Sequence, residues 1–109
     1  MAFIDVIPNS FSPVVGTSQA MTASGSSSSI SISTGGTQIR IYNGGTVIAF
    51  VRWGLGAQTA LPTSVGTPGD LPIYPGAIEV FNKQWTDNTL AAITMSSSTT
   101  LYVTVGSGT

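Results

Sequence analysis

Short stretches of alternating apolar and polar residues, interrupted by Gly, Pro and Ser, run along most of the chain from residue 30 onward. Thr, Val, Ile and aromatic residues recur in these stretches, and none of them has the 3.6-residue periodicity of an amphipathic helix. The pattern indicates about six to eight short strands. It predicts an all-β domain, built as a single small β-sandwich or jelly roll.

The clearest predicted element is a pair of strands at Thr37–Asn43 and Thr46–Trp53. In the first strand Ile39 and Ile41 lie on one face, and polar residues lie on the other. The intervening Asn43-Gly44-Gly45 tolerates the positive φ angles that a tight hairpin turn needs. We therefore predict a β-hairpin at the centre of the fold.

The returning strand is apolar on both faces from Val47 to Val51, and Arg52 is the exception. Such a strand is usually central, covered on both sides by a second sheet or by a neighbouring subunit. A buried Arg52 needs a carboxylate partner, because an unpaired buried charge is strongly destabilising. We expect an ion pair of Arg52 with Glu79 or Asp70.

The rest of the domain is predicted from turn residues and alternation. Gly54–Gly69 is rich in Gly, Pro, Ser and Thr and is expected to form a long surface loop. A strand is expected at Ala77–Phe81, and a second hairpin is expected to join Leu90–Met95 to Thr100–Val105. In the last strand three alternate residues are predicted to face the core: Leu101, Val103 and Val105.

The N-terminal part of the chain differs from the rest, because its apolar residues do not alternate and Ser24–Ser29 is a Gly/Ser tract. We therefore divide the chain into an N-terminal arm and linker at residues 1–29 and a β-sandwich domain at residues 30–109. The arm either adds a strand to its own fold or docks on a neighbour. The residues expected at an interface are large and apolar: Phe3, Ile4, Ile7, Phe11, Trp53 and Trp85.

Charged residues make up only 6% of the 109 residues, against roughly 25% in an ordinary soluble domain. Little charge repulsion keeps copies of such a chain apart, so the surface suits a protein packed against others in an assembly. The net charge of −1 gives no electrostatic reason to bind nucleic acid or an anionic membrane. The N-terminus lacks the basic region of a signal peptide, and no apolar run reaches the roughly 18 residues of a membrane span. We expect the chain to be made in a cytoplasm.

The sequence favours neither catalysis nor metal binding. It contains no His to activate its serines and no Cys, and its four acidic residues are scattered along the chain. Asp87 and Asn88 lack the surrounding acidic pattern of a calcium loop, and the two glycines around Leu55 are not a dinucleotide fingerprint. We therefore expect no catalytic residues, no cofactor and no metal. Four aromatic residues could form a sugar-stacking platform, although core or interface positions are favoured: Tyr42, Trp53, Tyr74 and Trp85.

Five stretches form a pattern within residues 30–106: Gln38–Thr46 (QIRIYNGGT), Ala49–Gly54 (AFVRWG), Asp70–Phe81 (DLPIYPGAIEVF), Ala91–Thr94 (AAIT) and Thr100–Thr104 (TLYVT). This pattern resembles small virion proteins of tailed bacteriophages, and it looks like the capsid decoration, or cement, proteins. The motif is structural rather than catalytic, and residues 1–29 lie outside it.

The resemblance implies a homodimer or homotrimer on the outside of the virion capsid, where it would stabilise contacts between major capsid subunits. Such proteins act through added interface area, and many copies make weak contacts strong in sum. The same strand–turn–strand pattern is compatible with a tail or head fibre module that binds a host receptor or glycan. The copy number per particle separates the two classes, since a cement protein is present in hundreds of copies.

Overall fold

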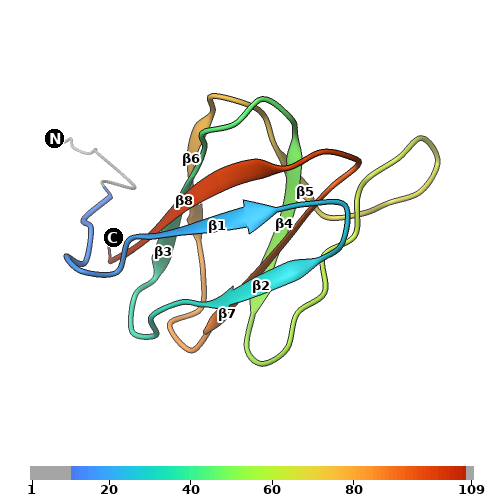
Figure 1. Cartoon of the computed structure of the whole chain (residues 1–109). Helices are drawn as coiled ribbons and strands as arrows, with labels where there is room; N and C mark the ends of the chain where they lie inside the picture. Colours follow the sequence, from blue (N-terminus) through green and yellow to red (C-terminus); the bar gives the residue numbers. More distant parts are fainter. Residues whose placement is uncertain (1–10, 108–109) are drawn as a thin grey trace, which may run out of the picture.

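Two four-stranded antiparallel sheets make up the fold of the computed structural model, which describes residues 11–107 (Figure 1). The part described contains no helix. Sheet A has the strand order β1 (Gln19–Ala23), β8 (Thr99–Gly106), β3 (Gln38–Asn43) and β6 (Ile78–Asn82). Sheet B has the strand order β2 (Ser28–Ser31), β7 (Thr89–Thr94), β4 (Ala49–Gly54) and β5 (Leu71–Ile73). The expected all-β class is confirmed.

The core lies between the two sheets, and one face of most strands contributes to a single apolar cluster. In β8 the predicted inward residues Leu101, Val103 and Val105 are 0%, 1% and 1% exposed, which confirms the alternation. From sheet B, Val51 and Leu90 are equally buried in the same cluster. Complete burial of each such side chain contributes about 1.5–3 kcal/mol, so this cluster is the main stabilising element of the fold.

Connections between consecutive strands mostly cross from one sheet to the other. Among the strands of residues 11–107, β4 and β5 are the only consecutive pair in the same sheet. The predicted hairpin of Thr37–Asn43 and Thr46–Trp53 is therefore wrong, because β3 pairs with β6 and β8 while β4 pairs with β5 and β7. The predicted hairpin of Leu90–Met95 and Thr100–Val105 is wrong for the same reason, since β7 belongs to sheet B and β8 to sheet A. Both turns are corners between the sheets.

A completely buried Asn43 holds the corner between β3 and β4. Its Nδ2 donates hydrogen bonds to the carbonyl oxygens of Val47 at 2.8 Å and Ile73 at 2.9 Å. Its Oδ1 accepts hydrogen bonds from the N–H of Gly45 at 3.1 Å and from Oγ1 of Thr99 at 2.6 Å. Gly45 is required here, because a Cβ at this position would overlap the Thr99 side chain. The Asn-Gly-Gly sequence thus turns the chain between the sheets instead of closing a hairpin.

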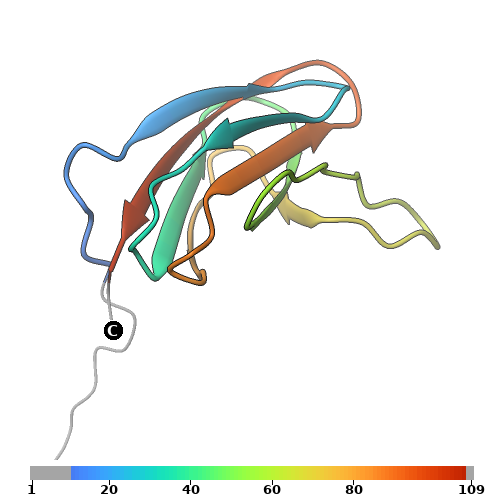
Figure 2. The ribbon, with the colours of Figure 1, turned by 90° about the horizontal axis from the view of Figure 1, so that it is seen from below.

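A second apolar cluster covers the outer face of sheet B. Phe50 and Ile93 lie side by side on this face, and Ala60 packs on them from the loop between β4 and β5. This explains why the strand at Val47–Val51 is apolar on both faces: the second sheet covers one side, and a loop of the same chain covers the other. The loop was predicted at Gly54–Gly69, and its far end projects beyond the sheets in both ribbon views (Figures 1 and 2).

In the structure the β-sandwich begins before residue 30, the start expected from the sequence. The expected arm and linker at residues 1–29 include β1 and the beginning of β2, which are the edge strands of the two sheets. Much of the Ser24–Ser29 tract forms the corner between them, because its small polar residues fit a turn that crosses the sandwich. The predicted interface residues Phe3, Ile4 and Ile7 lie outside the described residues.

Candidate functional site

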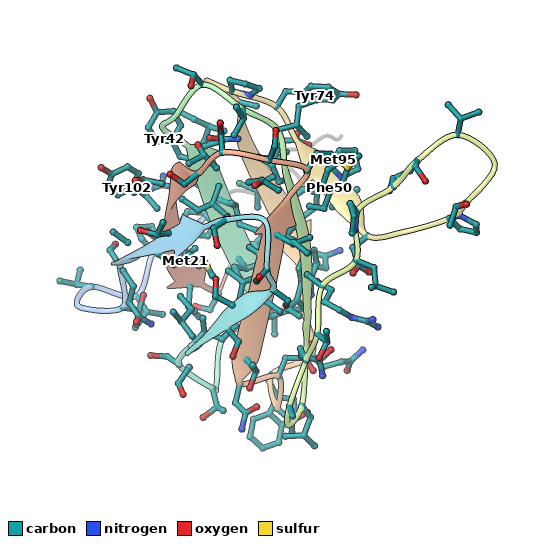
Figure 3. All side chains as sticks on the ribbon, turned by 45° about the vertical axis from the view of Figure 1, so that its right-hand side comes forward. Met21, Tyr42, Phe50, Tyr74, Met95 and Tyr102 are labelled. Atoms are coloured by element: carbon teal, nitrogen blue, oxygen red, sulfur yellow. The ribbon has the colours of Figure 1, made fainter. Side chains whose placement is uncertain are left out.

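A row of exposed apolar side chains crosses the outer face of sheet A. The strand register places Ala20, Tyr102, Tyr42 and Ile78 opposite one another on four adjacent strands, and this set is called the tyrosine row. The two tyrosine rings are stacked, with centroids 5.9 Å apart and planes 23° apart (Figure 3). Tyr42, Tyr102 and Ile78 are 37%, 50% and 64% exposed. The row therefore leaves apolar surface exposed across four adjacent strands.

Residues 11–14 occupy the part of this face nearest the end of β8. The guanidinium carbon of Arg40 lies 4.8 Å from the centre of the Phe11 ring, a cation–π contact. Pro13 forms an isolated β-bridge with Gly106, which extends the edge of sheet A. The predicted interface residue Phe11 is half-buried against its own sheet.

A pocket of about 560 Å³ lies between the exposed end of β4 and the long loop, and it contains the Arg52–Asp70 ion pair. Nη1 of Arg52 is 3.9 Å from Oδ1 of Asp70, and the two side chains are 47% and 16% exposed. The other oxygen of Asp70, Oδ2, accepts a hydrogen bond from the Leu61 N–H at 2.7 Å. The alternative partner Glu79 lies on β6 of the other sheet, on the same face as the inward Phe81. Arg52 points outward under the loop, so it meets Asp70 and not Glu79.

We predict that Arg52→Met changes the free energy of unfolding by less than about 1 kcal/mol, because the ion pair is half-exposed and longer than a hydrogen bond. Asp70→Ala is expected to cost about 1–2 kcal/mol, since it removes the acceptor for the Leu61 N–H. Urea unfolding of both variants measures these changes. A loss above 2 kcal/mol for Arg52→Met would show that the pair itself stabilises the fold.

The aromatic residues considered for sugar stacking occupy different surfaces. Trp53 packs inside the sandwich against Phe81, with ring centroids 5.2 Å apart, whereas Trp85 is 62% exposed in the connection between β6 and β7. Tyr42 belongs to the tyrosine row. Tyr74 lines a separate groove of about 480 Å³, together with Phe50 and Met95 on the sheet B side (Figure 3). The four rings therefore do not form one platform.

Lys83 is a buried charged residue whose role was not visible in the sequence. Its Nζ donates hydrogen bonds to the carbonyl oxygens of Gln84 and Asp87, each at 3.1 Å. Burial lowers the pKa of the Lys83 ammonium, and the negative charge of Asp87 partly offsets that change. Asp87 Oδ2 in turn accepts a hydrogen bond from the Gln84 N–H at 2.9 Å. Lys83 and Asp87 thus close the turn after β6.

Within residues 11–107, no group of three or more acidic, His or Cys side chains is placed to hold a metal ion. The same part of the chain has no helix with the length and apolar character of a membrane span. Comparisons with protein-family models, with curated proteins and with solved structures found no match for this chain. Of the described surfaces, the tyrosine row and the Tyr74 groove offer apolar contact area, and the Arg52 pocket offers one cation beside one carboxylate.

Proposed function

We propose that this protein is a structural virion protein that binds the outer surface of a tailed-bacteriophage capsid and stabilises contacts between major capsid subunits. The observation that carries the proposal is the tyrosine row: an exposed, uncharged apolar surface across all four strands of one sheet. Contiguous exposed surfaces of this kind mark contacts with other protein chains, and in the assembly proposed here that chain is a neighbouring copy or a capsid subunit. The low charge content of the chain supports the same conclusion, since an assembled surface needs little charge to remain soluble.

We further propose that the sandwich is a jelly roll. Its strand order supports this, because the antiparallel neighbours β1–β8, β2–β7, β3–β6 and β4–β5 are the pairs of a long hairpin folded over on itself. Viral capsid proteins and lectins are among the proteins built on such double-sheet folds. The fold alone does not define a function, so the contact surfaces carry the proposal.

In this proposal the protein is not an enzyme, and it acts through contact area. Each copy that binds to assembled subunits but not to dissociated ones stabilises the shell by mass action. The contacts would be apolar and hydrogen-bonded, through tyrosine hydroxyls and backbone groups, with few ion pairs. We therefore expect binding to vary little with salt, because salt mainly screens charge–charge interactions. The active form would be a symmetric homo-oligomer in which the N-terminal segment contributes to contacts between copies or with the capsid.

The proposal predicts saturable binding of the purified protein to expanded capsids of the phage that encodes it. A chain lacking residues 2–10 is expected to retain the folded sandwich, since Pro13 and Val14 still pair with β8, but to bind capsids at least tenfold more weakly. Co-sedimentation measures binding, and circular dichroism checks the fold. If the shortened chain binds as well as the full chain, the anchor lies elsewhere.

A second candidate function, a tail or head fibre module that binds a host glycan, is favoured by the Arg52 pocket. There the Arg52 guanidinium can donate to a sugar hydroxyl, and Oδ1 of the fixed Asp70 can accept from another. Glycan-array binding that is abolished by Arg52→Met, together with only a few copies per particle, would select this function over capsid decoration.

A further inference from the structure

We propose that residues 3–7 of one copy of this chain lie across the tyrosine row of a second copy. The inference rests on the homo-oligomer of the proposed function, and it names the acceptor surface for the N-terminal segment. Tyr42 and Tyr102 are stacked and exposed, and Ile78 and Val80 continue the apolar surface on β6. Gly44 lies beside the two tyrosine rings, and within the described part of the chain the three large side chains of the row remain 37–64% exposed.

Within one copy, the chain from Val14 back to Ser12 runs away from that copy's own tyrosine row. The N–H of Val14 donates to the carbonyl oxygen of Val105 at 2.9 Å, and the N–H of Ser107 donates to that of Ser12 at 2.9 Å. Followed backwards from Val14, the chain therefore runs past the end of β8 and away from Tyr102. Residues 8–10 connect Phe11 to the segment 3–7. Fully extended, the chain from Phe11 to Ile7 spans at most about 13–14 Å, so the acceptor copy packs next to this end of sheet A.

The composition of the segment matches the surface. Residues 3–7 contain four large apolar side chains and one charged residue, Asp5. Among the described residues, the outer face of sheet A has one charged side chain, Arg40, which pairs with Val80 in the row next to the tyrosines. A carboxylate in the middle of an apolar segment and a guanidinium beside an apolar row are complementary in charge.

The outer face of sheet A is too small for a stable dimer formed by two such faces in direct contact. The area therefore favours exchange of the segment between copies. A face of four strands and about five residues measures roughly 320 Å², so two such faces bury about 650 Å² together. This is near half of the roughly 1,200 Å² at the lower end of specific stable interfaces. Reciprocal exchange of two apolar segments adds the missing contact area.

The absence of cysteine from the chain allows a direct test by disulfide formation between two single-cysteine variants. Full-length Ile4→Cys and Ile78→Cys chains, one of them isotopically labelled, are mixed under mild oxidation and analysed by mass spectrometry. The control mixes Ile4→Cys with Val65→Cys, since Val65 is fully exposed at the tip of the loop. We expect the 4–78 disulfide between labelled and unlabelled chains to form at least tenfold faster than the 4–65 disulfide. Equal rates would overturn the inference.

A chain carrying both Ile4→Cys and Ile78→Cys tests the same surface within one molecule. If its disulfide forms within single chains and none forms between mixed chains, the segment covers its own sheet and the inference is overturned. This outcome is separate from the proposed function. A 4–78 link between copies without capsid binding would reject the function and keep the inference, and capsid binding without the link would do the reverse.

Discussion

Asn43→Leu is expected to lower the free energy of unfolding by about 3–5 kcal/mol, a large part of the roughly 5–15 kcal/mol that stabilises an ordinary domain. Leu has a similar size but can neither donate to the carbonyl oxygens of Val47 and Ile73 nor accept from Gly45 and Thr99. These four groups, two buried and two partly buried, would lose their partners. Each unsatisfied buried group costs about 1–3 kcal/mol, partly reduced where the corner relaxes.

Urea unfolding measures this effect, with Asn82→Leu as the matched control. Asn82 is also a strand residue of sheet A, but it is exposed at the edge on β6. The control is expected to change stability by less than about 0.5 kcal/mol, as most exposed substitutions do. If Asn43→Leu is no more destabilising than Asn82→Leu, the hydrogen bonds of Asn43 do not hold the corner between the sheets.

Val51→Asp is expected to cost about 4 kcal/mol or more, because it places a carboxylate in the central cluster between the two sheets. Val51 is 1% exposed on β4, and the side chains around it are apolar. A buried carboxylate without a partner must be desolvated or protonated, and both are unfavourable. Val65→Asp is the matched control, since Val65 lies fully exposed at the loop tip. Thermal unfolding that is unchanged in Val51→Asp would contradict the position of β4 in the core.

The strand content and much of the core could be predicted from alternation alone. The inward residues Leu101, Val103 and Val105 alternate with polar or exposed ones, so their face follows from a local pattern. The pairing of the strands could not be predicted in this way. An Asn-Gly-Gly sequence suits both a hairpin turn and a corner between sheets, and the choice depends on Thr99, which is 56 residues away from Asn43. The sequence around Asn43 contains no signal for that contact.

The candidate site shows the same division between local and long-range information. Tyr102 faces outward because it alternates with core residues, and this orientation could be predicted from the sequence pattern. Its stacking on Tyr42 depends on the register of β3 against β8, which only the fold defines. Arg52 was correctly expected to have an acidic partner, but the choice of Asp70 over Glu79 required knowing which sheet each strand joins. The start of the domain was placed too late because β1 and β2 are short and flank a Ser-rich corner.

The central proposal requires that a tailed phage encodes this chain, and electron cryomicroscopy of that phage's mature head tests it most directly. The proposal predicts density for the two-sheet sandwich on the outside of the shell, in hundreds of copies at the seams between major capsid subunits. The tyrosine row is expected to be covered in that density. The chain's absence from the shell, or its presence in only a few copies at the tail, would contradict a role in capsid stabilisation.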